Sequence, residues 1–412
     1  MPTAIVDVDV ERIPAELVGL ERYERALVLL RVRGHPVGQM TLPVTHGRID
    51  GAAIRDYALD RERWPLWERW LLEHIGWDPV NAASNAPRVA TVVIITHDRP
   101  DDLQRALEAV LRLEPDGEAH EILVVDNCPS SDDTRALVAG YRGVRYVRED
   151  RRGASAARNR ALSEARHDIV AFTDDDAAPD PGWLRALLRN FDDPLVYCAT
   201  GLTMPLELET DAQEASERYT PHGRGYSRIV FSGSRCNPLS VGQVGVSLNM
   251  ALRRSVLEHV GAFDELLGPG TPCRCGEDYD LFSRILAAGY RIVYDPAALS
   301  WHRHRRTWEE LHDTVFGYGV GVYAWWTRSV LVEREWSAMQ HALRWFVRKQ
   351  MPTLARALRA RRRSPVPASL VWAELRGCMA GPWAYLASRH RARRASRAAR
   401  ANAPAPATER AA

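Results

Sequence analysis

The feature that most constrains the fold is a run of short apolar segments that alternate with amphipathic segments, from Val89 to Phe191. Continuous apolar runs bounded by turns are typical of strands covered on both faces of a parallel sheet, and helical periodicity is typical of the segments that cover them. Strands are expected at 89–96, 121–126, 144–147 and 169–173, and helices at 100–113, 132–141, 154–165 and 181–191. The sequence therefore predicts an α/β fold with a doubly wound, mainly parallel sheet.

Differently patterned regions flank this α/β core. An alternating segment over 25–44 predicts a hairpin that turns at 35–38, and 61–75 predicts a short helix. Residues 78–88 are rich in Asn, Ala and Pro, which is typical of a linker. We expect an N-terminal accessory segment at 1–86, the α/β domain at 87–330, an amphipathic helical extension at 331–388 and a disordered basic tail at 389–412.

The composition excludes several classes of protein. With 46% hydrophobic and 26% charged residues, the 412-residue chain is typical of a globular protein and not of a disordered or fibrous one. Six irregularly spaced cysteines argue against a secreted disulfide framework and against paired zinc-binding motifs. The acidic N-terminus lacks the features of a signal peptide, and no run of about 18 apolar residues predicts a membrane span. We therefore expect a cytoplasmic protein.

Polar side chains follow the predicted strands at their carboxyl ends, where ligands bind in open α/β sheets. They are Thr96 and Asp98 after the first strand, Asp126 and Asn127 after the second, and Asp174, Asp175 and Asp176 after the fourth. Several carboxylates at one sheet edge repel one another unless a cation lies between them. A Mg²⁺ or Mn²⁺ ion that carries substrate phosphates is the simplest solution, because both ions prefer oxygen ligands.

The aspartate triplet itself allows two interpretations. In an extended segment alternate side chains lie on one face, so Asp174 and Asp176 are predicted to face one ligand while Asp175 faces elsewhere. The alternative is an acidic turn that caps the helix beginning near Pro181. The polar ends of the neighbouring strands favour the ligand.

Two predicted helix starts carry further candidates. Gly153 and the small residues after it open a helix that places Arg158 in its first turns, where a cation is unfavourable unless an anion such as a diphosphate is bound. Ordinary helix packing also explains those small residues. Glu277 and Asp278 open a later helix, where carboxylates suit either the helix dipole or a general base for an acceptor hydroxyl. The Gly- and Pro-rich segment 268–272 before them is expected to be a loop that orders over substrate.

A histidine-rich segment follows a short strand predicted at 292–295. His302 can complete a metal site as a neutral imidazole, and Arg305 or Arg306 can neutralise phosphate. The alternating His and Arg residues of 302–306 are also typical of a solvated basic turn.

The ordered set of motifs resembles family 2 of the glycosyltransferases, enzymes with the GT-A fold that transfer sugar from a nucleotide sugar. The resemblance covers about residues 89–326. It rests on Thr96 and Asp98, Val124-Val125-Asp126-Asn127, Gly153 with Ala157-Arg158-Asn159, the triplet 174–176, Gly276-Glu277-Asp278 and Trp301-His302.

The resemblance implies a role for each of these residues. The nucleotide-sugar pocket would comprise Thr96, Asp98, Asp126, Asn127, Arg158, Asp174 and Asp175. Asp174 and Asp176 resemble the DXD pair that holds ribose and metal, with His302 as the remaining metal ligand. Asp278 would be the catalytic base, and Glu277 would orient either the acceptor or Asp278.

The resemblance implies an inverting, metal-dependent, hexosyltransferase-like enzyme of cell-envelope polysaccharide or glycolipid synthesis. Its cofactor would be Mn²⁺ or Mg²⁺, its donor a UDP-sugar in preference to other nucleotide sugars, and its acceptor a carbohydrate or a lipid-linked sugar. The alternatives are a non-catalytic sugar- or nucleotide-binding protein on the same fold and a sugar-phosphate nucleotidyltransferase. The sequence does not support the nucleotidyltransferase. Such an enzyme would have a Gly- and Lys-containing phosphate loop after the first strand, and this chain has His97-Asp98-Arg99-Pro100 there.

The sequence of the last part of the chain allows two interpretations of the surface that its helices contact. Residues 335–358 combine apolar and aromatic residues with Arg and Lys, and 367–386 have a similar character. Such helices either pack onto the α/β domain or lie on an anionic membrane, which would place the protein on the inner face of the plasma membrane. No nucleic-acid partner is expected, because no recognition motif accompanies the Arg-rich tail. Residues 205–243 are expected to be a long connection that supplies acceptor contacts.

Overall fold

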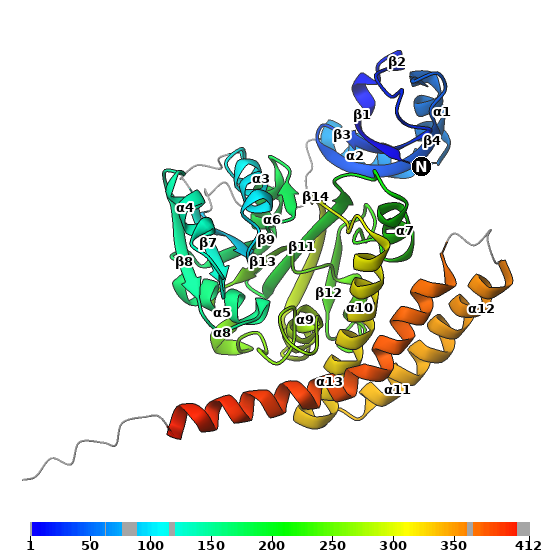
Figure 1. Cartoon of the computed structure of the whole chain (residues 1–412). Coiled ribbons are helices and arrows are strands. Elements are labelled where there is room, and N and C mark those ends of the chain that lie inside the picture. Colours follow the sequence, from blue (N-terminus) through cyan, green and yellow to red (C-terminus); the bar gives the residue numbers. More distant parts are fainter. Residues whose placement is uncertain (1, 62, 76–88, 115–119, 361–365, 402–412) are drawn as a thin grey trace, which may run out of the picture.

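The computed structural model describes residues 2–61, 63–75, 89–114, 120–360 and 366–401 (Figure 1). A large central sheet with flanking helices forms the middle of the molecule. A smaller β-containing unit lies at one end of this sheet, and a layer of C-terminal helices lies along its side.

The central sheet has nine strands in the order β10-β14-β11-β13-β9-β6-β7-β8, and β12 also pairs with β14. The strands are β6 (Thr91–Thr96), β7 (Glu121–Asn127), β8 (Val144–Glu149), β9 (Ile169–Asp174), β10 (Ala177–Pro179), β11 (Val196–Pro205), β12 (Ile229–Ser232), β13 (Asn249–Arg253) and β14 (Arg291–His302). Six strands run in one direction, and β10, β12 and β13 run in the other. This confirms the predicted α/β class with a mainly parallel sheet.

Helices cover both faces of the sheet. They are α3 (Pro100–Val110), α4 (Asp133–Ala139), α5 (Ala154–Glu164), α6 (Trp183–Leu188) with η2 (Arg189–Asp192), α7 (Asp211–Tyr219), α8 (Val256–His259) and α9 (Glu277–Ala287), and η3 is Val241–Gln243. Val92 and Ile94 pack in the core that contains α3 and α6, whereas Val93 and Ile95 pack in the core that contains α5 and α9. Strand β6 therefore buries both of its faces, which explains its continuous apolar run in the sequence.

Two segments of the central domain differ from the prediction. The strand predicted at 292–295 continues to His302. Its register with β11 shifts between the pairs Gly201–Asp295 and Thr203–Ser300, and Pro296 lies in the bulge that this shift creates. Proline lacks an N–H and is tolerated in a sheet at such bulges. The connection predicted at 205–243 contains α7 and β12, and the preceding buried strand β11 was not predicted.

The N-terminal unit has its own small sheet, in the order β1-β3-β4, and its own core. Its elements are β1 (Thr3–Asp9), η1 (Val10–Arg12), β2 (Glu16–Leu17), β3 (Arg25–Val32), β4 (His35–Pro43), β5 (Ile49–Asp50), α1 (Gly51–Arg61) and α2 (Arg63–His74). The predicted hairpin forms as β3 and β4, but its turn is at Arg33 and Gly34 and not at 35–38. Both turn residues have positive φ, 48° and 84°, as tight two-residue hairpin turns require. The predicted linker at 78–88 lies outside the described residues.

The N-terminal unit contacts the central domain through named groups. The backbone N–H of Thr3 donates to the carbonyl of Leu208 at 2.8 Å, and Arg31 pairs with Asp180 at 2.8 Å. Leu27 and Leu29 of β3 share a small apolar cluster with residues of β11 and β14. The unit therefore braces the β14 side of the sheet.

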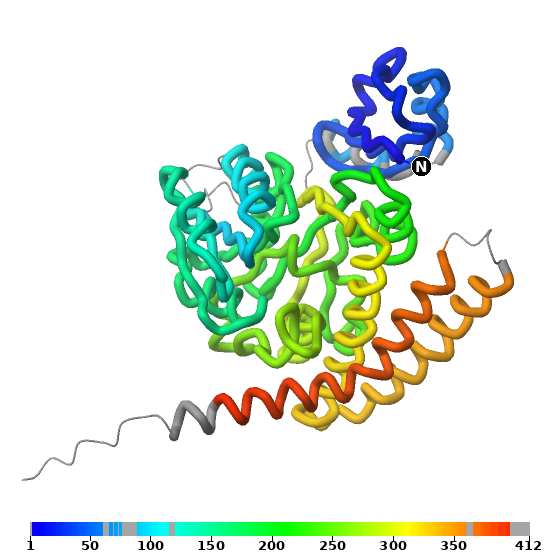
Figure 2. The backbone as a smooth tube through the Cα atoms, in the orientation of Figure 1, coloured from blue at the N-terminus to red at the C-terminus, as the bar shows by residue number. Residues whose placement is uncertain are grey.

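The C-terminal part is helical, and α11, α12 and α13 form a layer outside α10 (Figure 2). Its elements are α10 (Trp308–Arg328), η4 (Ser329–Glu333), α11 (Ser337–Trp345), η5 (Phe346–Gln350), α12 (Met351–Ala360) and α13 (Ala368–Ala401). Residues 389–401 of the predicted disordered tail are therefore helical, and 402–412 lie outside the described residues. Among the helices described, none has the length and apolar character needed to span a bilayer.

Glycines allow α10 and α13 to pack closely. A Cβ atom on Gly319 would lie 2.2 Å from the carbonyl oxygen of Glu374, and one on Gly377 would lie 2.1 Å from that of Phe316. Backbone atoms cannot move aside as flexible side chains can, so these positions tolerate no larger residue without separation of the helices.

We expect Gly319→Ala to lower the free energy of unfolding by about 1–3 kcal/mol, because the added methyl overpacks this helix contact. Gly317 on the same helix is the matched control, since its Cβ would meet Arg274 at an ordinary 3.5 Å. Gly317→Ala should be neutral or slightly stabilising, because alanine favours helix. Thermal and urea unfolding of both variants measure the difference, and equal stability of the two would contradict this packing.

Candidate functional site

A cavity of about 300 Å³ lies at the carboxyl ends of β6, β7 and β9. Side chains from three predicted strand ends converge there, together with the N-terminal part of α5 and the loop before α9. The lining residues include Thr96, Arg99, Asn127, Arg158, Asp174, Asp175, Asp176, Pro269, Gly270 and Arg305. The cavity thus combines three consecutive carboxylates with four guanidinium groups, those of Arg99, Arg152, Arg158 and Arg305.

The aspartate triplet is not extended throughout. Strand β9 ends at Asp174, and Asp175 and Asp176 form a turn before β10. All three residues therefore line the cavity, which corrects the expectation that Asp175 faces elsewhere. The Asp175 carboxylate accepts a hydrogen bond from the Thr96 hydroxyl at 2.8 Å.

Neighbouring charges act differently on the two carboxylates of the turn. Burial and the charge of Asp176 raise the pKa of Asp175 to about 7. Burial also opposes ionisation of Asp176, but His302, Arg305 and Arg99 together hold the pKa of Asp176 well below its usual range. The Asp176 carboxylate lies 3.4 Å from His302 Nε2, 3.3 Å from Arg99 and 3.5 Å from Arg305.

Arg158 is a buried cation that joins two elements of the site. Its side chain is 2% exposed, and it lies 2.8 Å from Glu277 Oε1 and 3.5 Å from Asp174 Oδ1. Burial raises the pKa of both carboxyls, and the Arg158 charge counteracts that rise. Arg158 therefore compensates carboxylates of the protein while it also lines the cavity.

Asp278 follows Glu277 at the start of α9 and is not among the cavity-lining residues. The helix start is set by Gly276, whose φ is +96° and whose Cβ would lie 2.6 Å from the carbonyl oxygen of Gly321. One Asp278 oxygen accepts the backbone N–H of Tyr279 at 2.8 Å. Burial raises the pKa of Asp278 above its usual value.

The other predicted residues of the strand ends have structural partners. Asn127 lines the cavity and holds the chain before α5, because its side chain accepts from the Gly153 N–H and donates to the Arg151 carbonyl, both at 2.8 Å. Asp126 is fully buried and accepts from the Tyr146 hydroxyl at 2.9 Å. Asp98 has φ +52° and accepts from the Ser130 N–H at 2.9 Å. Neither aspartate lines the cavity.

Sequence reasoning missed two residues of this region. Arg99 pairs with Asp175 and Asp176, and its position directly after β6 was a usable signal. His222 lies beside His302, although it belongs to the segment after α7. No local pattern connects two histidines so far apart in the chain.

Replacement of Arg158 by Met should lower the free energy of unfolding by about 3–5 kcal/mol, because Glu277 and Asp174 would be buried without their cation. The second change Glu277→Gln should recover part of that loss, since it removes one uncompensated charge. Arg160→Met is the control on the same helix, because Arg160 is 41% exposed in its pair with Glu164 and should lose less than about 1 kcal/mol. Urea unfolding of the four proteins tests this, and similar losses for Arg158 and Arg160 would refute it.

Comparison with known proteins gives one family match. Residues 91–261 match the sequence model of Glycosyl transferase family 2. This range contains Thr96, Asp126, Arg158 and the aspartate triplet, whereas Glu277, Asp278 and His302 lie beyond it.

Two curated proteins are similar to this chain. The chain is 30% identical over 244 residues to a pre-mycofactocin glycosyltransferase of Mycobacterium tuberculosis, with 58% of this chain and 47% of that protein covered. It is 29% identical over 236 residues to the succinoglycan biosynthesis protein ExoO of Rhizobium meliloti, with coverage of 50% and 58%. The chain thus spans about half the length of these curated relatives.

A mannosyltransferase from Pyrobaculum calidifontis, solved with GDP-Man and Mn²⁺, is similar with a TM-score of 0.45 and 18% identity, over 86% of this chain and 88% of that one. The family match covers the sheet edge on which the predicted motifs converge. Residues 91–261 therefore carry a domain that matches Glycosyl transferase family 2.

Proposed function

We propose that this protein is an inverting, metal-dependent glycosyltransferase that moves a sugar from a nucleoside diphosphate sugar to an acceptor hydroxyl. The observation that carries the proposal is the cavity at the strand ends of a family 2 domain, which three aspartates and four arginines line. Carboxylates suit a divalent cation and ribose hydroxyls, and guanidinium groups suit a diphosphate.

The donor atoms present fit Mn²⁺ or Mg²⁺. Asp176 and His302 lie 3.4 Å apart, and Asp174 Oδ1 is buried without a hydrogen-bond partner in the described part of the chain. We assign the cation to Asp176 and His302, with Asp174 at the ribose or at a water of the ion. A bound cation would stabilise the negative charge of the departing diphosphate.

The remaining residues of the strand ends bind and orient the donor in this proposal. Thr96, Asn127 and Asp175 line the cavity where the nucleotide would lie, and Arg158 supplies a buried positive charge at its floor. Asp98 and Asp126 support the same pocket from positions beside it. The loop at Pro269 and Gly270 borders the cavity and can cover the bound donor.

Asp278 is the proposed general base. It would remove the proton of the acceptor hydroxyl, whose oxygen attacks the anomeric carbon directly, so that no bond to the protein forms. The raised pKa of Asp278 supports this role, because a base works best when its pKa is near the working pH. Glu277, held by Arg158 at 2.8 Å, orients the start of α9 beside it.

The acceptor is proposed to be a carbohydrate or a lipid-linked sugar of the cell envelope, and the donor a UDP-sugar. The relative named for succinoglycan biosynthesis supports an acceptor of this class. The UDP preference follows from the family resemblance, and GDP- and dTDP-sugars are the alternatives.

Asp278→Asn should lower kcat by about 10²- to 10⁴-fold, because the amide keeps the shape but cannot accept the proton. Nucleotide binding should be retained, since Asp278 does not line the cavity. Asp313→Asn, an exposed change on α10, is the control. Transfer to an acceptor and donor binding are measured separately, and unchanged turnover in Asp278→Asn would exclude this base.

Donor and metal are tested together by thermal stabilisation with UDP-, GDP- and dTDP-sugars, each with Mn²⁺, with Mg²⁺ and with a chelator. A ligand at about 100 times its Kd stabilises the folded state by about 2.7 kcal/mol. We expect the UDP-sugars to raise the midpoint, and the chelator to remove most of the shift. Binding without product formation would favour the non-catalytic alternative, whereas release of pyrophosphate from a nucleoside triphosphate and a sugar phosphate would favour the nucleotidyltransferase.

A membrane contact through the C-terminal helices is the second part of the proposal. Met379 and Trp383 of α13 are 77% and 72% exposed, and Trp336, Met339, Leu343 and Val347 on and beside α11 are also exposed. Arg344, Arg348 and Arg356 are exposed on α11, η5 and α12. Apolar side chains among cations match an anionic bilayer surface, where a lipid-linked acceptor would be found.

We expect Met379→Ser with Trp383→Ser to reduce co-sedimentation with vesicles that contain an anionic lipid, because less apolar surface is then buried in the interface. Val18→Ser, at a 65% exposed position of the N-terminal unit, is the control. Equal sedimentation of the three proteins would reject the membrane contact, and a concentration-dependent dimer that the double change abolishes would assign this face to a second copy.

A further inference from the structure

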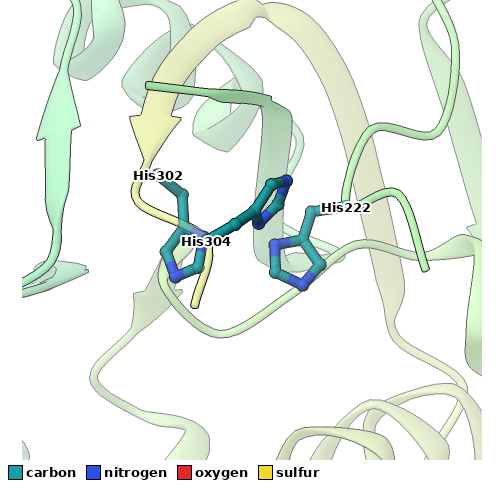
Figure 3. Close-up of side chains that lie close together, drawn as sticks. All are labelled: His222, His302 and His304. Carbon is teal, nitrogen blue, oxygen red and sulfur yellow. The ribbon is translucent and has the colours of Figure 1, made fainter. Parts of the chain in front are cut away.

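Three imidazole rings lie together beside the carboxylate cavity (Figure 3). His302 ends β14, His304 follows two residues later, and His222 comes from the segment between α7 and β12. One ligand nitrogen of each ring lies within 4.8 Å of one of each other ring. His302 and His304 are almost fully buried.

The spacing of the rings matches a tetrahedral metal site. The ring centroids are 4.9 Å apart for His222 and His302, and 5.5 Å apart for each of the other two pairs. With Zn–N bonds of about 2.0–2.1 Å and tetrahedral angles, the centroids of ligating imidazoles lie about 5 Å apart and their nitrogens about 3.3 Å apart. The centroids are therefore already at the spacing of a tetrahedral site, whereas the nitrogens, which lie within 4.8 Å of one another, would have to approach more closely to share an ion.

The partners of the rings indicate which nitrogens are available. Every Nε2 atom lies near an oxygen outside the cluster: His304 is 2.8 Å from Glu217 Oε2, His222 is 3.4 Å from the Tyr318 hydroxyl and His302 is 3.4 Å from Asp176 Oδ1. The Nδ1 atoms of His222 and His302 are buried and have no hydrogen-bond partner among the described residues. A buried polar atom without a partner costs free energy, and a metal ion would remove that cost.

The carboxylates complete the pattern. A histidine that ligates a metal through one nitrogen usually donates its other N–H to a carboxylate or another oxygen, which fixes the tautomer and orients the ring. Glu217 is placed to do this for His304, and Asp176 for His302. Three histidines that only pack against one another would not each require an oxygen acceptor at Nε2.

We propose that His222, His302 and His304 form a trihistidine site for a nitrogen-preferring divalent cation of the Zn²⁺ class. Neutral imidazoles suit Zn²⁺, Cu²⁺ and Ni²⁺, whereas the carboxylates of the adjacent cavity suit Mg²⁺ and Mn²⁺. The two sites meet at His302. A neutral His302 ring can ligate the proposed cavity cation through Nε2 or the trihistidine ion through Nδ1 with its Nε2–H donated to Asp176, so the two arrangements exclude each other at this ring.

The site is tested by Zn²⁺ titration of the full-length protein, after removal of metal, in competition with a chromophoric chelator. We expect one tightly bound Zn²⁺ and, with Co²⁺ as the probe, the visible absorption band of a tetrahedral ion. His222→Ala should weaken Zn²⁺ binding by at least about 100-fold and abolish the Co²⁺ band, while Glu217→Gln should weaken binding by about 10- to 100-fold. Circular dichroism verifies that each variant is folded, and His222→Gln replaces any variant that is not.

Two controls separate this site from its surroundings. His167→Ala removes a histidine before β9, at the other end of the sheet, and should bind Zn²⁺ like the unchanged protein. Asp176→Asn removes a ligand of the proposed Mn²⁺ site but only the outer partner of His302, so it should weaken Zn²⁺ binding no more than Glu217→Gln does, which distinguishes the trihistidine site from the proposed Mn²⁺ site. The proposal would be overturned if His222→Ala had unchanged Zn²⁺ affinity. It would also be overturned if Asp176→Asn lost Zn²⁺ binding while His222→Ala retained it. These readouts do not require transfer activity, so they stand apart from the proposed function.

Discussion

The buried charges at the carboxyl edge of the sheet are the constraint on which the rest of the structure depends. Asp174, Asp175, Asp176 and Glu277 all lie in or beside one small cavity, and unpaired buried carboxylates would cost several kcal/mol each. Arg158 neutralises part of this charge from α5, and Arg99 and Arg305 do so from the ends of β6 and β14. Three carboxylates and four guanidinium groups line the cavity, so both a divalent cation and a diphosphate would meet oppositely charged groups there.

Several local features hold these charges in place. Asn127 holds the chain before α5 through Gly153 and Arg151, and so fixes the helix that carries Arg158. The positive φ of Gly276 begins α9 at the point where Glu277 reaches Arg158. The close approach of Gly276 to Gly321 then ties the same helix start to α10, and α10 in turn packs on α13. The C-terminal helices therefore support the site although they contribute no residue to its lining.

Most of the α/β core could be predicted because its signals are local. The four βα units from β6 to α6 each carry a continuous apolar run and an amphipathic helix, and the structure has them within a few residues of the expected bounds. Strands β11 and β13 were not predicted, and β14 was predicted only over 292–295, because these strands pair with partners distant in sequence and β14 contains a proline in a bulge. The hairpin turn was misplaced because Arg33 adopts the positive φ that a glycine or asparagine usually supplies.

The same distinction applies to the site. Residues directly after strands, such as Thr96, Asn127 and the aspartates, were found because a parallel sheet places strand ends together. Their orientations were not predictable, since the turn at Asp175 and Asp176 breaks the alternation of an extended chain. His222 and Glu217 were not found, because only the folding of the α7 region against β14 brings them to His302 and His304.

His302 lies where two kinds of ligand chemistry meet. The His302 ring lies beside the carboxylate of Asp176 and also beside the imidazole rings of His222 and His304. One imidazole nitrogen cannot both donate a proton to Asp176 and offer its lone pair to an ion there, so the protonation of Nε2 is set by what Nδ1 binds. The trihistidine cluster can therefore control which cation chemistry the carboxylate cavity supports, without any movement of the sheet that holds both.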